Sequence, residues 1–556
     1  MVASVFSTQK KYLDWPALLL AAVMAVPLLG VMGSAAAAAL HTDAWNALWV
    51  DPQLPAALAM TLWTGLTATA LAVALAALLM SLSFPGPRWE RIVKALAPVL
   101  AVPHAAFAIG LAFLIAPSGW LLRAFSPWAT GFDAPPAWPT TQDPWGLGLI
   151  AVLVAKEVPF LLWAAATQLR RADTAARWAR ELDVATSMGY APRTAWWRIV
   201  WPQLWPRLGG PLLAVLAYSL TVVDMALVIG PTTPPTLAVL AWQWLLDADA
   251  AINAQGAAAA WLLALVVAVL AGVLWAGPAL LRWRSRWTNG QRGASSRGLH
   301  SRLLVLFTLA ALPAIYIAVM LALAVGSVSG VWPFPRLLPD NSSWQGWQSV
   351  AASAQTVWTT FALALISGLT ALAWSVAWLE YAPARLDVQL RRLIYLPLLL
   401  PSVLWVVGLH RLSLAWGIDG HWSGLYLAHS LAATPYVLIA LSPAYLNFDT
   451  RYACIAASLQ KSRWHFLAGI KWPLLKASLS AALAVGFAVS VAQYLPTLFI
   501  GAGRFATVTT EAVTLASGAQ RSLTAAYAWL QWLLPALMFG AAAWVGRPRH
   551  FGRVPA

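Results

Sequence analysis

The sequence contains very little cysteine and very little charge. Its 556 residues include one cysteine, Cys454, and only 10% are Asp, Glu, Lys or Arg. A single cysteine excludes an intramolecular disulfide framework and any metal site built from several cysteines. So few charged side chains cannot cover the surface of a soluble globule of this length. The chain also lacks a Gly-rich phosphate-binding loop with Lys and Ser or Thr, so nothing in it predicts ATP hydrolysis.

Apolar residues instead make up 61% of the chain and form long runs. A run of about 20 such residues crosses roughly 30 Å of hydrocarbon. The pattern therefore predicts an all-α, multi-pass membrane protein with about twelve transmembrane helices. The predicted spans lie near 16–36, 57–82, 95–116, 147–169, 209–230, 257–279, 303–327, 356–379, 393–415, 424–446, 477–500 and 523–546.

The net charge of +16 lies in short basic clusters between the apolar runs. That placement predicts orientation in a membrane and argues against nucleic-acid binding. An N-terminus in the cytoplasm puts 29 of the 35 Lys and Arg on the cytoplasmic side, together with the C-terminus. We therefore expect both termini to be cytoplasmic, and we interpret the first span as an uncleaved anchor rather than a signal peptide.

The two halves of the chain share an ordered series of matches. Gly110 recurs as Gly408 at an offset of 298, and Pro202 recurs as Pro473 at 271. Offsets change only in loops, which predicts two six-helix repeats in parallel orientation that enclose a path between them. The predicted parts are a first half over 1–279, a basic flexible cytoplasmic linker over 280–302 and a second half over 303–556.

The most informative repeated segment is a loop over about 171–207 that recurs over about 447–475. In the first copy, an apolar stripe runs along one helix face at Trp178, Leu182, Ala185 and Met188. We expect Gly189 to end that helix, Pro192 to begin a second short helix and Pro202 to stop it. The pattern leaves two interpretations open: a helix that enters a groove of a partner protein, or one that lies on lipid headgroups.

The segment from Asp183 to Pro202 resembles the signature loop of bacterial ABC importer permeases. It has the acidic residue, the small residue Ala185, Gly189 and the following aromatic, aliphatic and Pro positions. The second copy departs from the pattern, with Cys454 at the acidic position and Gln460 at the Gly position. The fusion of two six-span halves resembles the double permeases of the ferric-iron and thiamine class.

That resemblance implies the fold of a type I ABC importer permease in a bacterial inner membrane. It implies two cytoplasmic ABC ATPase subunits and a periplasmic solute-binding protein as partners, no cofactor, and no catalysis by this chain. It also implies a set of ATPase-docking residues. These are Asp183, Ala185, Met188, Gly189, Trp196, Ile199, Pro202, Ala456, Leu459, Gln460, Ile470 and Pro473.

Charged residues inside spans are costly and usually face a cavity. Asp224 and the counterpart region's Gln493 are therefore candidates for the translocation path, although Asp224 also fits a structural hydrogen bond to a neighbouring helix. A secondary transporter with twelve spans stays open as an alternative function. The transported solute is not predicted: iron, thiamine and a polyamine all stay open.

Overall fold

The structure is a computed structural model, which describes residues 15–169, 172–282, 299–518 and 520–547. Within those ranges it is helical throughout, apart from loops and one isolated bridge between Ser329 and Ser342. Most of the predicted linker, residues 283–298, lies outside the described residues.

The helices follow one another without any sheet. Those up to the predicted linker are α1 Trp15–Ala38, α2 Thr42–Val50, α3 Leu54–Ser83, α4 Pro87–Leu100, α5 His104–Ile115, α6 Trp120–Phe125, α7 Leu147–Leu169, α8 Ala172–Ser187, α9 Pro192–Ala195, α10 Trp201–Leu204, α11 Gly209–Thr221, α12 Asp224–Ile229, α13 Leu237–Leu245 and α14 Ala250–Arg282. Those after it are α15 Leu299–Ser327, α16 Gln345–Ala352, α17 Ala354–Tyr381, α18 Ala384–Tyr395, α19 Ser402–Ala415, α20 Trp422–Leu446, α21 Arg451–Ser458, α22 Arg463–Phe466, α23 Trp472–Leu474, α24 Lys476–Val491, α25 Leu495–Gly501, α26 Val508–Ala516 and α27 Arg521–Val545.

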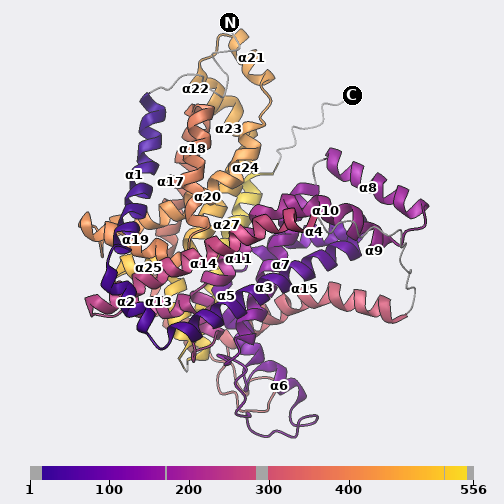
Figure 1. The fold of residues 1–556 in the computed structure, drawn as a ribbon, viewed down its shortest axis with the longest axis vertical. Coiled ribbons are helices and arrows are strands. Elements are labelled where there is room, and N and C mark those ends of the chain that lie inside the picture. The colour runs from indigo at the N-terminus through magenta and orange to yellow at the C-terminus, as the bar shows by residue number, and fades with distance from the viewer. Residues whose placement is uncertain (1–14, 170–171, 283–298, 519, 548–556) are drawn as a thin grey trace.

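Two groups of long helices form the body of the molecule. Helices α3, α7 and α11 pack against one another, and α17, α20 and α24 do the same. The two groups run in clearly different directions (Figure 1). The shorter helices repeat this arrangement: α12, which follows α11, packs on α5, and α25, which follows α24, packs on α19.

The first helix of each half packs against a helix of the other half. Helix α1 lies along α19, and α15 lies along α5 and α27. Both crossings depend on a glycine. A Cβ at Gly408 would lie 2.2 Å from the carbonyl oxygen of Val31, and one at Gly110 would lie 2.9 Å from that of Val319. Only a residue without a side chain allows such close approach, so the two halves interlock.

The number of spans is lower than the predicted twelve. Among the described residues, nine helices are long and apolar enough to cross a membrane, or up to eleven if each of two bent pairs is one span. The segment near 209–230 was predicted as one span, but it forms two short helices, α11 and α12. The helix breaks at Val222 and Val223, where the backbone is extended at Val222. The chain is therefore an all-helical, multi-pass membrane protein with nine to eleven candidate spans.

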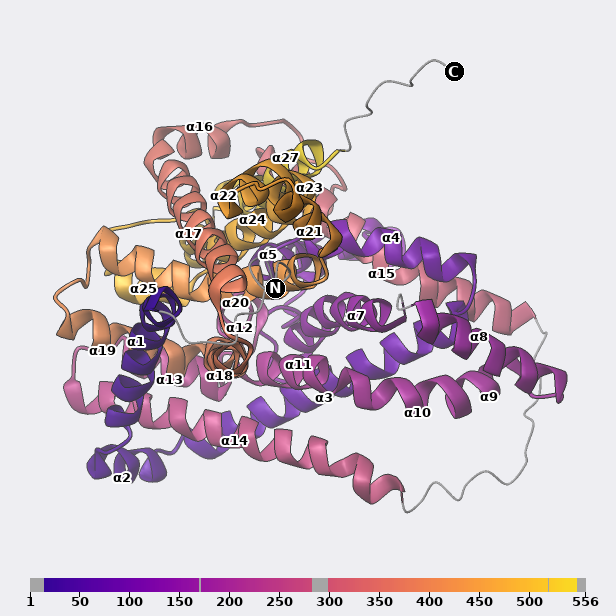
Figure 2. The same cartoon turned by 90° about the horizontal axis from the view of Figure 1, so that it is seen from above.

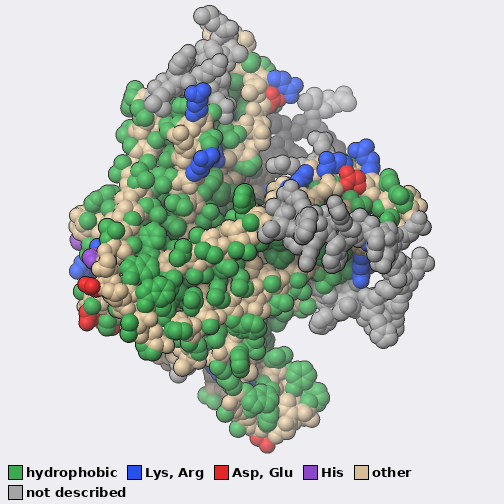
Figure 3. Space-filling view, in the orientation of Figure 1, with side chains coloured by type: hydrophobic (Ala, Val, Ile, Leu, Met, Phe, Trp, Pro, Cys, Tyr) green, Lys and Arg blue, Asp and Glu red, His purple; other side chains and the backbone are tan. Residues whose placement is uncertain are grey.

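Large apolar side chains cover the outer faces of these helices, as Figure 3 shows for one side of the molecule. Leu19 and Val26 on α1, and Leu265 and Val273 on α14, are all more than half exposed. A soluble protein rarely exposes so continuous an apolar surface, whereas lipid tails match it.

Candidate functional site: the two loops before α11 and α24

The first predicted docking loop folds as a helix, a sharp turn and a second short helix. Helix α8 ends at Ser187, and Gly189 follows with a left-handed φ of +86°. The Tyr190 N–H donates to the Ala185 carbonyl at 3.0 Å and closes the turn. Helix α9 then begins at Pro192, as predicted. Gly189 fits this turn because glycine adopts positive φ at no steric cost.

The second loop has the same backbone geometry despite its different sequence. Helix α21 ends at Ser458, and Gln460 takes a left-handed φ of +52°. The Lys461 N–H donates to the Ala456 carbonyl at 3.0 Å, which matches the bond in the first loop at an offset of 271. A residue with a Cβ is strained there, so Gln460 holds a conformation that suits glycine better.

The predicted stop at Pro202 is wrong. The chain remains helical through α10, because a π-helical turn over Trp196–Val200 (η2) precedes the proline. Its wider bond from the Trp201 N–H to the Trp196 carbonyl lets the helix bend before Pro202, which has no N–H to donate. An equivalent π-helical turn, Leu467–Lys471 (η6), precedes Pro473.

The apolar stripe on α8 is used inside the loop itself. Trp178, Leu182 and Ala185 are buried and belong to one apolar cluster with Trp196. Met188 is 58% exposed and is not part of that cluster. The buried part of the stripe therefore holds the loop's two helices together, and Met188 at its end stays exposed.

Exposed apolar side chains occupy matching positions of the two loops. Val184 and Met188 are each 58% exposed, and their counterparts at offset 271, Ile455 and Leu459, are 56% and 63% exposed. Val184 and Ile455 were missed from the sequence. Their spacing of four residues from Met188 and Leu459 is the signal that could have found them, because it puts each pair on one helix face.

The structure divides the predicted docking residues by exposure. The exposed ones are Asp183, Met188, Gly189, Pro202, Leu459, Gln460 and Pro473; Ile199 and Ile470 are half-buried; Ala185, Trp196 and Ala456 are buried. The buried residues shape the two loops, and the exposed ones are available to a partner.

The first loop is held by one glutamine. Gln203 accepts hydrogen bonds from the Trp178 indole and the Arg177 guanidinium, each at 2.9 Å. Its amide donates to the Glu181 carboxylate and to the Ile199 carbonyl, also at 2.9 Å. All four partners lie within the loop, so Gln203 joins α8 to η2 without using a transmembrane helix.

The second loop is held by a carboxylate outside it. Glu380, near the end of α17, accepts hydrogen bonds from Lys471 at 2.8 Å and from Arg463 at 3.0 Å. Periodicity gave no sign of this contact, which joins residues 83 and 91 positions apart. At the start of the loop, Asp449 is hydrogen-bonded by Arg451, which holds the pKa of that exposed carboxyl below its usual range.

The two candidate path residues lie at corresponding helix breaks. Asp224 is the first residue of α12, after the break that follows α11, and is half-buried. Gln493 lies between α24 and α25, where its amide donates to the Val489 carbonyl at 3.1 Å. At the end of α11, the Thr221 carbonyl accepts a hydrogen bond from the Ser402 hydroxyl of the other half at 3.3 Å. The breaks thus bring polar groups of both halves towards one region.

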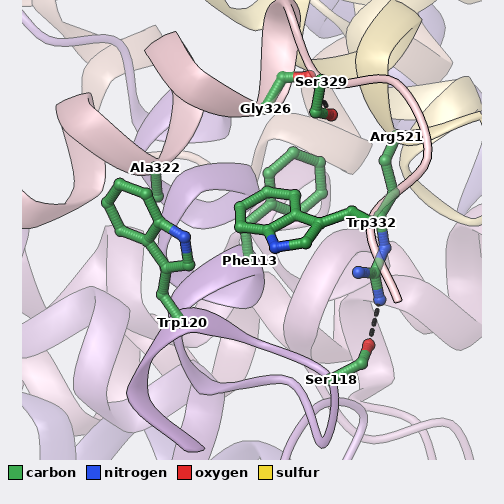
Figure 4. A pocket seen from close by; sticks show the side chains of 8 residues that line it. All are labelled: Phe113, Ser118, Trp120, Ala322, Gly326, Ser329, Trp332 and Arg521. Atoms are coloured by element: carbon green, nitrogen blue, oxygen red, sulfur yellow. Dashed lines mark hydrogen bonds between the residues drawn. The ribbon is translucent and has the colours of Figure 1, made fainter. Parts of the chain in front are cut away.

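The end of the molecule near α6, opposite α8 and α21 in Figure 1, is closed by contacts between the halves. The Arg123 guanidinium donates to the carbonyls of Trp332, Pro333 and Arg336 at 2.7–3.1 Å. Beside it, Arg521 is hydrogen-bonded to Ser118 at the rim of a small cavity (Figure 4). A cavity of ≈ 20 Å³ holds about one water molecule and no solute.

The two loops are separated across the molecule. Seen from above, α8, α9 and α10 lie along the right side, whereas α21, α22 and α23 lie at the upper centre, over the second group of long helices (Figure 2). A partner that contacts both loops must therefore be large, or be present twice.

The chain is similar over nearly its whole length to a known membrane protein. No protein-family model matches the chain. The chain is 35% identical over 542 residues to the inner membrane ABC transporter permease protein YnjC of Escherichia coli (strain K12). The match covers 95% of this chain and 96% of that protein.

Proposed function

The chain belongs to the inner-membrane ABC transporter permeases, and from this premise we propose that it is the fused permease of an importer, driven by two cytoplasmic ATPases. As a permease subunit, it spans the membrane several times, and ATP hydrolysis takes place in a separate chain. The proposed docking sites are the loops over about 171–207 and about 447–475.

The exposed apolar pairs carry this proposal. Val184 and Met188 in the first loop, and Ile455 and Leu459 in the second, occupy the same register on the same outward face. A short helix with such a pair fits a groove of a partner protein. Matching geometry in both loops is what two copies of one ATPase require.

The proposed fold is that of two parallel repeats with cytoplasmic termini. The recurring packing order supports it: α3, α7 and α11 correspond to α17, α20 and α24, and α12 on α5 corresponds to α25 on α19. ATP-driven approach of the two ATPases would then rock the halves between inward- and outward-facing states as rigid bodies.

The proposed translocation path runs past the two helix breaks at Asp224 and Gln493. Extended backbone within a bundle is tolerated where it lines a cavity, and Asp224 adds an acidic group there. A periplasmic solute-binding protein would deliver the solute, and we place the chain with the ferric-iron and thiamine class of double permeases. Identifying the ligand of the cognate binding protein would name the solute.

The lone cysteine provides a direct test of orientation and docking. Cys454 is exposed on α21 and is the only cysteine of the chain, so a membrane-impermeant maleimide reports on that position alone. We expect labelling in inside-out membrane vesicles and none in right-side-out vesicles. Bound ATPase should protect Cys454, and washing the ATPase off should restore labelling.

Two results would overturn the proposal. Labelling from the outer side would place the loops on the wrong side of the membrane. Import of the solute at the normal rate in cells that lack every partner ATPase would instead favour the secondary transporter.

A further inference from the structure

The buried carboxylate of Glu380 is the centre of a charged network that no part of the proposed mechanism uses. Its side chain is only 6% exposed. One oxygen accepts from the Lys471 ammonium at 2.8 Å and from the Tyr445 hydroxyl at 3.0 Å; the other accepts from the Arg463 guanidinium at 3.0 Å. Arg463 also donates to the Glu380 backbone carbonyl at 2.9 Å.

These partners lie at both ends of one segment of the second loop. Arg463 begins α22, and Lys471 ends the π-helical turn η6. Lys471 is fully buried, with its ammonium 3.9 Å from the centre of the Tyr445 ring. One carboxylate on α17 therefore fixes both the start and the end of this segment.

Among the described residues of the first half, no such network forms at the corresponding positions. Glu380 corresponds to Pro85 at the offset of 295 that relates Thr61 to Thr356, and Tyr445 corresponds to Leu169 at the offset of 276 that relates Pro159 to Pro435. At the offset of 271, Arg463 and Lys471 correspond to Pro192 and Val200. All four are apolar, and Leu169 and Val200 are buried. The first loop is closed instead by Gln203, within the loop. The two loops therefore have the same backbone geometry and different attachments.

We propose that Glu380 is a positioning residue that ties the second loop to α17, so that a displacement of this loop by its ATPase passes directly to a transmembrane helix. This inference rests on the proposed function. Charged hydrogen bonds are short and directional, so they fix the rotation of the segment as well as its distance from α17. Apolar contact in the first half fixes only the distance, which leaves that loop freer to move relative to its helix.

The attachment to α17 also compensates for two departures of the second loop from the signature pattern. That loop has Gln460 at the left-handed turn and Cys454 in place of the acidic residue. A strained turn is more easily deformed under load. A rigid link from η6 to α17 lets the second loop transmit motion without relying on that turn.

The test removes the two buried charges of the network together, while the partly exposed Arg463 keeps its hydrogen bond to the backbone carbonyl of residue 380. The double variant Glu380→Leu with Lys471→Val installs apolar side chains, with the valine that the first half has at that position. Replacing both members of a buried pair by apolar residues is often neutral for folding, whereas removing one leaves an uncompensated charge. Glu380→Gln is a second variant of the same side-chain size: its amide oxygen still accepts hydrogen bonds, but it leaves the Lys471 ammonium without a carboxylate.

Two measurements report on position and on coupling. A nitroxide attached to Cys454 reports how firmly α21 is held. The solute-stimulated ATPase activity that copurifies with the tagged permease from host membranes reports coupling. Asp449→Asn is the matched control, because it removes an exposed ion pair on the same loop, where the expected effect is negligible.

We expect the double variant to reach the membrane in normal amounts and Glu380→Gln in smaller amounts. In the permease recovered from either variant, we expect a more mobile nitroxide and a stimulated ATPase activity lower by roughly fivefold or more. The control should behave as the unmodified chain. Unchanged mobility and unchanged stimulation in the double variant would overturn the inference and leave the proposed function intact. Failure of any ATPase to copurify with the unmodified permease would instead overturn the proposed function, and the transmission role with it.

Discussion

Single residues decide whether each loop keeps its turn. Gly189 and Gln460 have the same left-handed backbone, yet only glycine adopts it without strain. The difference gives opposite expectations for substitution at the two positions.

Gly189→Ala should destabilise the first loop by about 1 kcal/mol, since a Cβ is unfavourable at φ +86°. Gln460→Gly should be neutral or stabilising by a similar amount, because it relieves the same strain. The thermal unfolding temperature of the purified chain measures the change in stability. The rate of solute import in cells measures the effect on transport. Gln460→Ala replaces one residue with a Cβ by another and should change little. Equal loss of transport in Gly189→Ala and in Gln460→Ala would therefore contradict this explanation.

The exposed apolar side chains give a second expectation at this scale. Burial of one such side chain in a partner's groove contributes about 1.5–3 kcal/mol. Met188→Asp and Leu459→Asp should therefore weaken ATPase binding at least roughly tenfold without lowering the amount of folded permease. Val331→Asp alters an equally exposed apolar residue near α6 and serves as the control. Equal weakening by all three variants would refute specific docking.

At the scale of elements, each loop is one unit made of two short helices and a π-helical turn. Gln203 is the only side chain that bonds to α8 and η2 at once among the described residues. The second loop has Leu474 at the matching position and uses Glu380 instead.

Gln203→Leu should loosen the first loop and leave the second unchanged. The buried Trp178 indole would lose its acceptor, a cost of about 1–3 kcal/mol. Amide hydrogen exchange should show faster exchange over α8 than over α21. Exchange that rises equally in both loops would mean that the variant damages the whole fold.

The boundaries of these elements could be predicted from the sequence better than the contacts that hold them together. The turn at Gly189 and the helix start at Pro192 follow from local backbone preferences, and the structure confirms both. Pro202 was wrongly predicted to stop its helix, because a π-helical turn is not visible in residue preferences. Glu380 and Gln203 were missed, since hydrogen bonds between distant segments leave no periodic signal.

At the scale of the whole molecule, composition was enough to predict a helical, multi-pass membrane protein, and the structure and the relative confirm it. The span count was less predictable, because hydropathy does not reveal the break at Val222 and Val223. The interlocking of α1 with α19 and of α15 with α5 was not predicted, although the pairing of Gly110 with Gly408 marked both crossings.

Gly408→Val and Gly110→Val should each prevent the halves from closing on one another. In both cases the new side chain would meet backbone atoms that cannot move aside, at 2.2 Å and 2.9 Å. The amount of folded permease that survives detergent extraction should fall severalfold. Gly540→Val is the control, because nothing lies within 4 Å of a Cβ there. Normal recovery of both crossing variants would show that the helices separate easily.

The interlock also has a consequence for biogenesis. Ribosomes release α1 early, but its main packing surface on α19 emerges more than 350 residues later. Until α19 is synthesised, α1 can contact only lipid or an insertion factor at the surface that later packs on α19. Because both halves belong to one polypeptide, α1 stays close to α19. In a transporter with separate subunits, the two helices would have to meet by diffusion in the membrane.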